Sequence, residues 1–284
     1  MRNVSQPALD PARAIRGSCL CGSVEFAVAP PYAWFANCHC SMCRKHHGAL
    51  FGSGLGVKRE RFAWLAGTSE IVRYRATSAF ERPFCRRCGS TLPGVSHDPD
   101  VLHVPAGLLE RLNAAPRTHI FVGSKSPLTV IADELPQHAA YPPGVRLAAV
   151  AIRRPPTSAG HTEGSCLCAA VAYRIDAPLE RLEHCGCGSC RKRTGSPYAT
   201  SALVPARNVR WLRGAGLVSV YRGAARGYAT AFCAHCGGLV PVAGARNGAA
   251  TVAVPAGALD TIADVHGGMT PAAASARGAA AIVA

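Results

Sequence analysis

Aromatic and acidic residues are scarce in this 284-residue chain, and long apolar runs are missing. Phe, Trp and Tyr make up 6% of the sequence, and 16 Asp and Glu accompany 31 Lys and Arg, for a formal net charge of +15. No run of 18 or more apolar residues occurs, so we expect no membrane-spanning helix. Residues 1–14 lack the continuous apolar segment of a signal peptide, and we therefore expect a cytoplasmic protein.

The excess of basic residues is spread over both halves of the chain. Its short basic runs, such as Arg191-Lys192-Arg193, have no aromatic residues between them. A basic surface can attract nucleic acid or small anions. Because no nucleic-acid motif accompanies the charge, we favour an arginine-rich solvated surface, with nucleic-acid binding as the alternative.

Cysteine is abundant in this chain, and the same spacing pattern of cysteines occurs twice. Each set of seven reads C-x-C, then C-x-C-x-x-C, then C-x-x-C-G, with about 147 residues between the copies. The two sets account for all 14 cysteines: Cys19, Cys21, Cys38, Cys40, Cys43, Cys85 and Cys88, and then Cys166, Cys168, Cys185, Cys187, Cys190, Cys233 and Cys236. Such spacing is typical of thiolates on tight turns that converge on a tetrahedral metal.

The repeat extends beyond cysteine and divides the chain. Trp64-Leu65 recurs as Trp211-Leu212, and Val104-Pro105-Ala106-Gly107 recurs at 254–257. We predict a complete first domain at 14–150, a Pro/Ser/Gly-containing linker at 151–163, a second domain at 164–266 that diverges at its C-terminal end, and an Ala/Gly-rich tail at 267–284 that is poorly ordered or weakly docked.

Cysteine usage also bears on the cofactor. Without export, C-x-C and C-x-x-C pairs are more typical of metal sites than of disulfides, and seven cysteines per repeat would leave one thiol unpaired. We favour zinc, up to four ions per chain, while iron or an iron–sulfur centre and disulfides are the alternatives.

Seven thiolates divide into four and three. Cys19, Cys21, Cys85 and Cys88 can close one four-thiolate site, and Cys166, Cys168, Cys233 and Cys236 can close its counterpart; such saturated zinc sites are structural. The remaining triads are Cys38, Cys40, Cys43 and Cys185, Cys187, Cys190. Three protein ligands with a free fourth position are typical of catalytic zinc. A histidine could instead close each triad, but none is convincingly shared between the copies.

Basic residues follow each triad, as Arg44-Lys45 and Arg191-Lys192-Arg193. Zinc with three thiolates carries a net charge of −1, and a fourth, anionic thiolate makes it −2, which is costly without nearby cations. Arg44 and Lys45 are therefore candidate anion-stabilising residues, although they could equally form an exposed helix start. The metal would deprotonate an added thiol and hold it as a nucleophile.

The secondary structure is expected to be mostly β. Val24, Phe26 and Val28 alternate with other residues, as do Val171, Tyr173 and Ile175, and each run directly follows a C-x-C pair. Further strands are expected from Trp64 to Tyr74 and at 101–104. Cys43 and Cys190 are candidates to open a short helical turn.

These motifs resemble the glutathione-dependent formaldehyde-activating family, also called the centromere-protein-V-like family. The resemblance rests on GSCLCG at 17–22, CHCSMCRK at 38–45, RPFCRRCGS at 82–90, VPAG at 104–107, and HIF at 119–121 with Ser124-Lys125. It implies two tandem Mss4-like domains of small coiled β-sheets organised around zinc sites. It also implies a structural four-cysteine zinc and a catalytic three-cysteine zinc.

The activity that the resemblance implies is a carbon–sulfur lyase or synthase reaction, which combines glutathione with formaldehyde to give S-hydroxymethylglutathione. Expected partners are therefore glutathione or another small thiol, with an aldehyde. In the second copy His39 becomes Gly186, Arg82 becomes Thr230, and the HIF segment is missing. We therefore expect activity mainly in the first domain. The alternatives are a non-catalytic zinc-binding module for nucleic acid or protein, and a metal or redox buffer.

Overall fold

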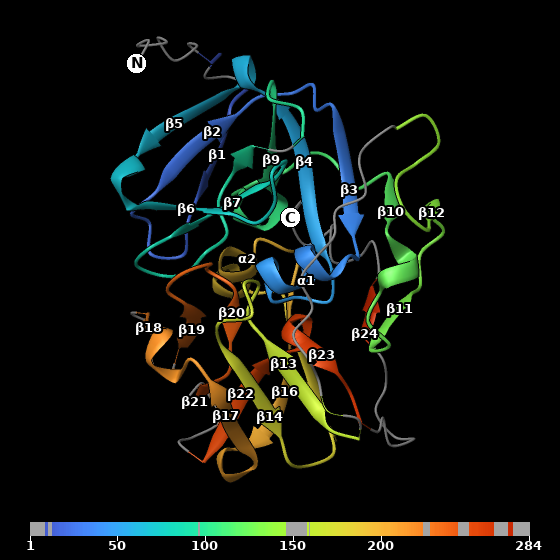
Figure 1. Ribbon diagram of the computed structural model, residues 1–284. Coiled ribbons are helices and arrows are strands. Elements are labelled where there is room, and N and C mark those ends of the chain that lie inside the picture. Colours follow the sequence, from blue (N-terminus) through green and yellow to red (C-terminus); the bar gives the residue numbers. More distant parts are fainter. Residues whose placement is uncertain are drawn as a thin grey trace.

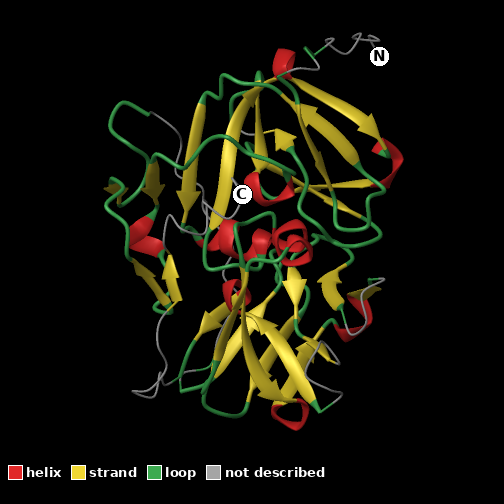
Figure 2. Ribbon diagram, turned by 180° about the vertical axis from the view of Figure 1, so that it is seen from behind, coloured by secondary structure: helices red, strands yellow, loops and turns green. Residues whose placement is uncertain are grey.

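The computed structural model describes residues 9–10, 13–95, 97–145, 158, 160–223, 228–243, 250–263 and 272–274. Two β-rich lobes, residues 13–145 and 160–263, are stacked end to end (Figure 1). Two short helices, α1 (Ser41–His47) and α2 (Gly188–Thr194), contact each other where the lobes meet (Figure 2). The expected mostly-β fold, repeated twice, is confirmed.

The first lobe is built from small sheets that are largely antiparallel. A three-stranded sheet has the order β1-β2-β5, a six-stranded sheet has the order β12-β10-β3-β4-β9-β8, and β6 pairs with β7. Their bounds are β1 Ile15–Ser18, β2 Glu25–Val28, β3 Trp34–Cys38, β4 Gly52–Lys58, β5 Phe62–Ala66, β6 Ile71–Arg75, β7 Glu81–Cys85, β8 Gly94–Val95, β9 Val101–Pro105, β10 Thr118–Ile120 and β12 Gln137–His138.

The second lobe repeats this plan with fewer strands in its main sheet. Its described sheets have the orders β17-β14-β13-β23, β15-β16-β22-β21 and β18-β19-β20. Their bounds are β13 Thr162–Ser165, β14 Ala172–Ile175, β15 Leu182–Cys185, β16 Ala199–Pro205, β17 Val209–Arg213, β18 Val218–Arg222, β19 Ala229–Cys233, β20 Leu239–Val240, β21 Val242–Ala243, β22 Thr251–Pro255 and β23 Leu259–Thr261.

Single turns of 3₁₀-helix connect many of these strands. They are η1 Arg59–Arg61, η2 Thr68–Glu70, η3 Ala106–Leu108, η4 Val122–Ser124, η5 Ala206–Asn208, η6 Ala215–Leu217 and η7 Ala256–Ala258. Two of them, η3 and η7, contain the repeated Ala-Gly dipeptide of the VPAG motif. They matter for the site because each contacts the helix of the other lobe, η3 with α2 and η7 with α1.

The alternating sequences form strands as expected. Phe26 and Val28 on β2, and Tyr173 and Ile175 on β14, are buried in the cores of their own lobes. The expected strand from Trp64 to Tyr74 is two strands, β5 and β6. They are separated at Gly67, whose φ of 72° is readily adopted by glycine.

The segment that follows η3 adds two strands, β10 and β12, to the main sheet of the first lobe. The described part of the second lobe has no counterpart of these strands. Strand β10 runs parallel to β3, with His119 opposite Asn37 and Ile120 opposite Cys38, and β12 pairs on its outer side. This pairing brings the HIF motif alongside the central cysteine triad. In the first lobe, β10 and β12 therefore lie beside the triad, and the described part of the second lobe has no such strands.

The lobes share their hydrophobic cores. Leu50, Phe51 and Leu128 of the first lobe belong to the buried cluster that contains Tyr173 and Val254 of the second. Equivalent residues of the two copies also meet: the Phe51 ring packs against Tyr198 at 5.6 Å, and the Phe84 ring against Phe232 at 6.1 Å. Because copies of the same position touch, the lobes are related by an approximate two-fold axis at their interface.

Glycine in each VPAG motif permits this close approach. A Cβ on Gly257 would lie 2.2 Å from the carbonyl oxygen of Ala49 and 2.5 Å from that of Arg44. A Cβ on Gly107 would lie 2.5 Å from the carbonyl oxygen of Ser196, and the Gly107 N–H donates to Gly195. The motif is thus a docking surface for the cysteine-bearing helix of the other lobe.

Most of the predicted linker and tail lies outside the described residues. Within the tail, Ala272–Ala274 forms β24, which pairs in parallel with β11 (Thr129–Ile131) of the first half. Among the described helices, none has the length and apolar composition needed to cross a bilayer.

Candidate metal centres

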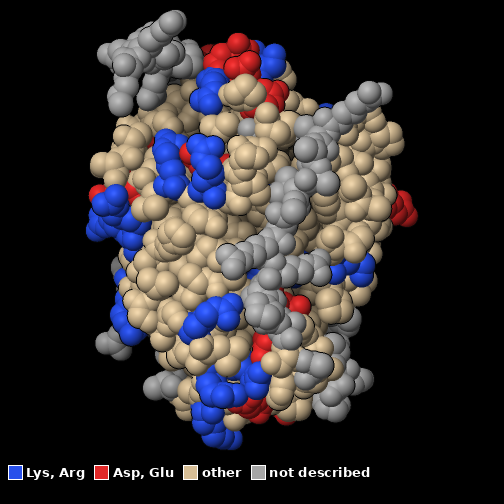
Figure 3. Space-filling view, in the orientation of Figure 1, with Lys and Arg blue, Asp and Glu red and all other residues tan. Residues whose placement is uncertain are grey.

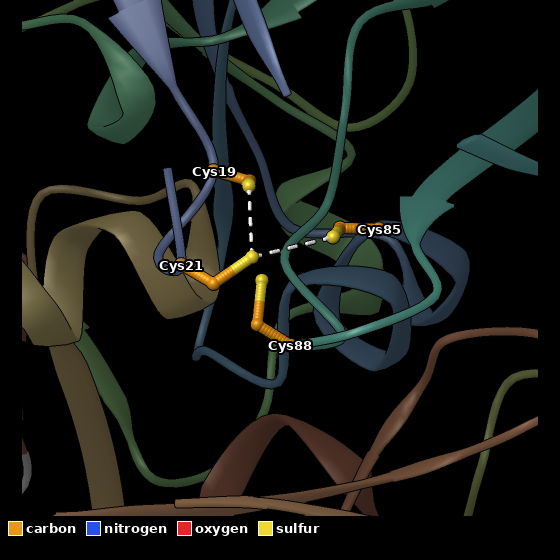
Figure 4. Close-up of side chains that lie close together, drawn as sticks. All are labelled: Cys19, Cys21, Cys85 and Cys88. Carbon is orange, nitrogen blue, oxygen red and sulfur yellow. Dashed lines mark hydrogen bonds between the residues drawn. The ribbon is translucent and has the colours of Figure 1, made fainter. Parts of the chain in front are cut away.

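Two turns form the four-cysteine site of the first lobe (Figure 4). Cys19 and Cys21 follow β1, while Cys85 ends β7 and Cys88 lies in the turn after it. All four sulfurs point toward one another and lie within 4.8 Å of one another. The Cys19–Cys21 sulfur distance is 3.5 Å, and the Cys21–Cys85 distance is 3.7 Å.

The second lobe has the same arrangement at Cys166, Cys168, Cys233 and Cys236. The sulfur of Cys168 lies 3.4 Å from that of Cys166 and 3.9 Å from that of Cys233. Backbone N–H groups support both sites: Val24 donates to Cys19 Sγ, and Val171 to Cys166 Sγ, each at 3.3 Å. Such donors stabilise thiolate charge.

The donor set fits a zinc ion. A tetrahedron with Zn–S bonds of about 2.3 Å has sulfur–sulfur edges of about 3.8 Å. The four edges given above, 3.4 to 3.9 Å, are close to that value and much longer than a disulfide bond, and the other edges are at most 4.8 Å. All 14 cysteines are free thiols. The predicted four-plus-three division of the cysteines matches the four groups that the structure brings together, and each group could hold a metal ion.

The triad of the first lobe lies where β3 ends and α1 begins. The sulfurs of Cys38, Cys40 and Cys43 lie within 4.8 Å of one another, and no histidine, aspartate or glutamate of the described residues joins the group. Cys40 is the N-cap of α1, and its sulfur accepts a hydrogen bond from the Cys43 N–H at 3.4 Å. The helix thus holds two of the three sulfurs in place.

A buried chain of polar groups lies beside this triad. His39 Nε2 is 2.8 Å from His119 Nδ1, and His119 Nε2 is 3.0 Å from Asp133 Oδ1. Both histidines have no exposed surface. His39 comes from the triad loop and His119 from β10, so the added strands of the first lobe bring the chain together.

The carboxylate at one end fixes the protons along the chain. Asp133 accepts from His119 Nε2–H, which leaves His119 Nδ1 as an acceptor for His39 Nε2–H. His39 Nδ1 then carries a lone pair, and this atom is buried without a hydrogen-bond partner in the described structure. Burial, together with the nearby His119 and Arg44, lowers the pKa of His39 to about 3, so its ring is neutral at neutral pH.

A buried arginine on β7 contacts the same triad. Arg82 lies on β7, is 5% exposed, and places Nη2 3.9 Å from Cys43 Sγ and Nε 3.4 Å from Met42 Sδ. Its guanidinium also lies over the Phe80 ring, 5.1 Å from the centroid. Hydrogen bonds from Cys38 and Cys43 lower the pKa of Cys40, and the charge of Arg82 adds to this effect.

The structure places Arg44 and Lys45 in different surroundings. Arg44 Nε donates to the carbonyl oxygen of His39 at 3.3 Å, beside the triad loop. Lys45 points into the second lobe, where Nζ bonds Ser165 Oγ at 2.7 Å and pairs with Asp260 at 2.8 Å. Its counterpart Lys192 points the other way and donates to Ser18 of the first lobe at 2.6 Å. Lys45 is therefore already paired at the interface between the lobes.

The triad of the second lobe has different neighbours. Cys185, Cys187 and Cys190 also lie within 4.8 Å of one another, but Cys187 is exposed. Gly186 replaces His39 in the loop. Arg193, three residues after Cys190 on α2, is buried, and its Nε has no hydrogen-bond partner in the described structure.

Each triad packs against the four-cysteine turn of the other lobe. Met42 and Cys40 belong to the apolar cluster around Cys166 and Leu167. In the reverse direction, Leu20, which lies between Cys19 and Cys21, packs against the cluster of Cys190. At the interface, the triad of each lobe therefore lies beside the four-cysteine site of the other lobe. Neither triad is enclosed by its own lobe alone.

On the face seen in Figure 3, the basic residues are not gathered into one patch. Lys and Arg form several separate groups on the face seen in Figure 3, with acidic residues among them. Lys45, Arg82 and Arg193 are buried and do not contribute to the surface charge. This distribution agrees with the expectation of a solvated basic surface rather than a continuous binding stripe.

Several residues of the site are absent from the sequence prediction. Arg82 and His119 lie in motifs that support the family resemblance, but spacing alone gave them no role. Asp133 had no sequence signal of its own, whereas Arg193 belongs to the basic run that follows the second triad. His47 was discounted as a ligand because the second copy has Thr194 there, and its Nδ1 lies 2.7 Å from the Thr194 carbonyl oxygen across the interface.

One family model matches both halves of this chain. The sequence profile of the glutathione-dependent formaldehyde-activating enzyme family matches residues 14–124 and again 161–275. A protein of Halomonas elongata (strain ATCC 33173), whose name assigns it provisionally as a glutathione-dependent formaldehyde-activating enzyme, is 38% identical over 87 residues. That match covers 28% of this chain and 54% of the relative, so the chain spans about half of the relative's length.

A crystal structure of a Rhodobacter sphaeroides protein is 26% identical to this chain. The superposition covers 34% of this chain and 90% of the other, with a TM-score of 0.29. The family match itself spans most of the sequence and occurs once in each repeat. The chain therefore belongs to the glutathione-dependent formaldehyde-activating enzyme family, whose domain it contains twice.

Proposed function

We propose that this protein is a zinc-dependent carbon–sulfur lyase or synthase that acts on thiol–aldehyde adducts, mainly through its first lobe. Family membership and the name of the Halomonas relative support glutathione and formaldehyde as the reactants. The observation that carries the proposal is the His39–His119–Asp133 chain beside the Cys38, Cys40 and Cys43 triad. The second triad has a glycine in place of His39.

The residues divide into structural and reactive sets. Cys19, Cys21, Cys85 and Cys88, with their four counterparts, would hold closed structural metal ions. Cys38, Cys40 and Cys43 would hold a metal that keeps one position for a ligand. A zinc ion bound there would supply a Lewis acid that favours the thiolate form of an added thiol.

The bond changes are simple and balance without a further reactant. In the forward direction the thiol sulfur bonds to the carbonyl carbon, and the carbonyl π electrons move to oxygen. The proton lost from sulfur ends on that oxygen, which gives the hydroxymethyl thioether. The reverse direction breaks the carbon–sulfur bond and releases both reactants.

The chain's own groups orient this hydroxyl. Because Asp133 and His119 fix its tautomer, His39 presents the Nδ1 lone pair as a hydrogen-bond acceptor. A hydroxyl placed at that atom donates to it, which holds the adduct in one orientation. Tyr141 lies near the same cysteines: burial raises its pKa to about 12, and the charges of Cys38 and Cys43 add to this. Its phenol therefore stays protonated at neutral pH.

An NMR assay tests the proposal. Zinc-loaded protein is mixed with glutathione and formaldehyde, and the rate of exchange into S-hydroxymethylglutathione is compared with the spontaneous rate. We expect acceleration by the wild type, with most of it lost in Cys38→Ser and little lost in the matched variant Cys185→Ser. His39→Gly, which copies the second lobe, should lower the rate about 100-fold or more. A rate equal to the spontaneous one, across several aldehydes, would reject the proposal.

A further inference from the structure

Each cysteine triad has one buried arginine, but the two arginines come from different positions. In the first lobe it is Arg82 on β7, and the aligned residue of the second lobe is Thr230. In the second lobe it is Arg193 on α2, and the aligned residue of the first lobe is His46. The two arginines and the two residues aligned with them are all buried. Each copy therefore has one buried arginine, but at a different position of the repeat.

Geometry places each arginine at its triad. Arg82 Nη2 lies 3.9 Å from Cys43 Sγ. Arg193 and Cys190 are three residues apart on α2, which puts them on one face of the helix, and both are 7% exposed.

The aligned partners cannot replace the missing charge. His46 is buried, and burial lowers its pKa well below the usual value, so its ring is neutral. Thr230 is uncharged and fully buried. A buried guanidinium without a carboxylate is costly, and among the described residues no ion pair joins Arg82 or Arg193 to an acidic side chain. The compensating negative charge available to each is its own set of thiolates.

We propose that Arg82 in the first lobe and Arg193 in the second are equivalent charge-compensating residues, each of which allows its three-cysteine metal site to take an anionic fourth ligand, such as a thiolate. A divalent ion with three thiolates carries −1, and a fourth thiolate makes the set −2. One guanidinium returns the total to −1. The second triad is then also a site for an anionic ligand, although it lacks His39.

This inference rests on the metal-binding part of the proposed function and not on its carbon–sulfur chemistry. The arginines act through the thiolates and are positioning residues. Loss of a neighbour that tunes a metal site commonly costs about 10- to 100-fold in metal affinity. The two four-cysteine sites in the same chain provide an internal reference, because neither arginine belongs to them.

Variants that move the arginine to the position it has in the other copy separate the effect of its charge from the effect of its packing. Zinc release is measured by competition with a chromophoric chelator at fixed pH, and glutathione binding to the zinc-loaded protein is measured by calorimetry. Arg82→Met should weaken one zinc about 10- to 100-fold and weaken glutathione binding, with the other three zincs unchanged. Adding His46→Arg to Arg82→Thr copies the second lobe and should restore both. The exposed Arg75→Met on neighbouring β6 is the control.

Variants of the second lobe test the proposal independently. Arg193→His should weaken a different zinc, and Thr230→Arg in the same chain should restore it. If Arg82→Met does not fold, Arg82→Lys, which keeps the charge, and the Arg193 pair decide the question. Unchanged zinc and glutathione affinities in Arg193→His and in Arg82→Met, or in Arg193→His alone if Arg82→Met does not fold, would overturn the proposal. A protein that shows these losses but no catalysis would retain this inference and refute only the carbon–sulfur activity.

Discussion

Lys45 of the first lobe and Asp260 of the second form a buried ion pair, with Nζ 2.8 Å from Oδ1 and side-chain exposures of 4% and 9%. The same ammonium donates to the carbonyl oxygen and the hydroxyl of Ser165. Lys45 lies on α1, two residues after Cys43, so the pair attaches the metal-binding helix of one repeat to the sheet of the other. The tandem arrangement is thus part of how the triad is held.

Asp260→Asn should destabilise the protein by about 3 kcal/mol, because it leaves the Lys45 ammonium buried without a carboxylate. The free energy of unfolding of the metal-loaded chain, measured with urea, checks this. Glu25→Gln is the control, because its partner Arg16 is 60% exposed and such surface pairs contribute about 0–1 kcal/mol. Equal effects of the two variants would show that the buried pair does not join the lobes.

Gly257→Ala should loosen the contact between η7 and α1. The added methyl group would lie within 2.5 Å of two carbonyl oxygens of the first lobe, so the backbone must shift, at a cost of about 1–3 kcal/mol. The melting temperature measures this loss. Gly216→Ala on η6 is a matched control, because a Cβ there meets no atom within 4 Å. A melting temperature that both variants leave unchanged would contradict the docking role of the motif.

Acidification should destabilise the protein through His47. Burial, with a smaller effect of Arg82, lowers its pKa from 6.5 to about 4, although the bond to Thr194 opposes this. The unfolded chain then binds more protons between pH 6.5 and about 4, so the stability from this group is present above pH 6.5 and is lost as the pH falls through that window.

The loss from His47 amounts to about 3 kcal/mol at most. Unfolding free energies of the wild type and of His47→Gln, measured from pH 7 to 4, should show a shallower slope in the variant. His161→Gln, at an exposed histidine, should keep the wild-type slope. If His47→Gln instead keeps the wild-type slope, burial does not hold this imidazole neutral.

The sequence predicts the local parts of the site well. Spacings of one and two residues confine neighbouring cysteines to single turns, so both triads follow from local sequence, whereas each four-cysteine group needs the fold to bring two distant turns together. The alternation around Phe26 and Tyr173 predicts β2 and β14 for a similar reason, since side-chain direction along a strand depends only on neighbouring positions.

The remaining parts depend on contacts between distant residues. His39 and His119 are 80 positions apart and meet because β10 adds to β3, which no spacing rule indicates. Lys45 followed the triad and was expected at the metal site or on an exposed helix start, yet the two-fold relation of the lobes directs it to Asp260. The exchange of Arg82 and Arg193 is visible in the aligned copies only after the fold shows that both positions face a triad.

The number of zinc ions per chain tests the central claim, that each repeat combines a closed four-cysteine site with a three-cysteine site. Elemental analysis of protein purified with zinc should give four ions per chain in the wild type. The combined variant Cys38→Ser, Cys185→Ser should give two, because it disables both triads and leaves the closed sites intact. No bound zinc, or the same number in both proteins, would contradict the account.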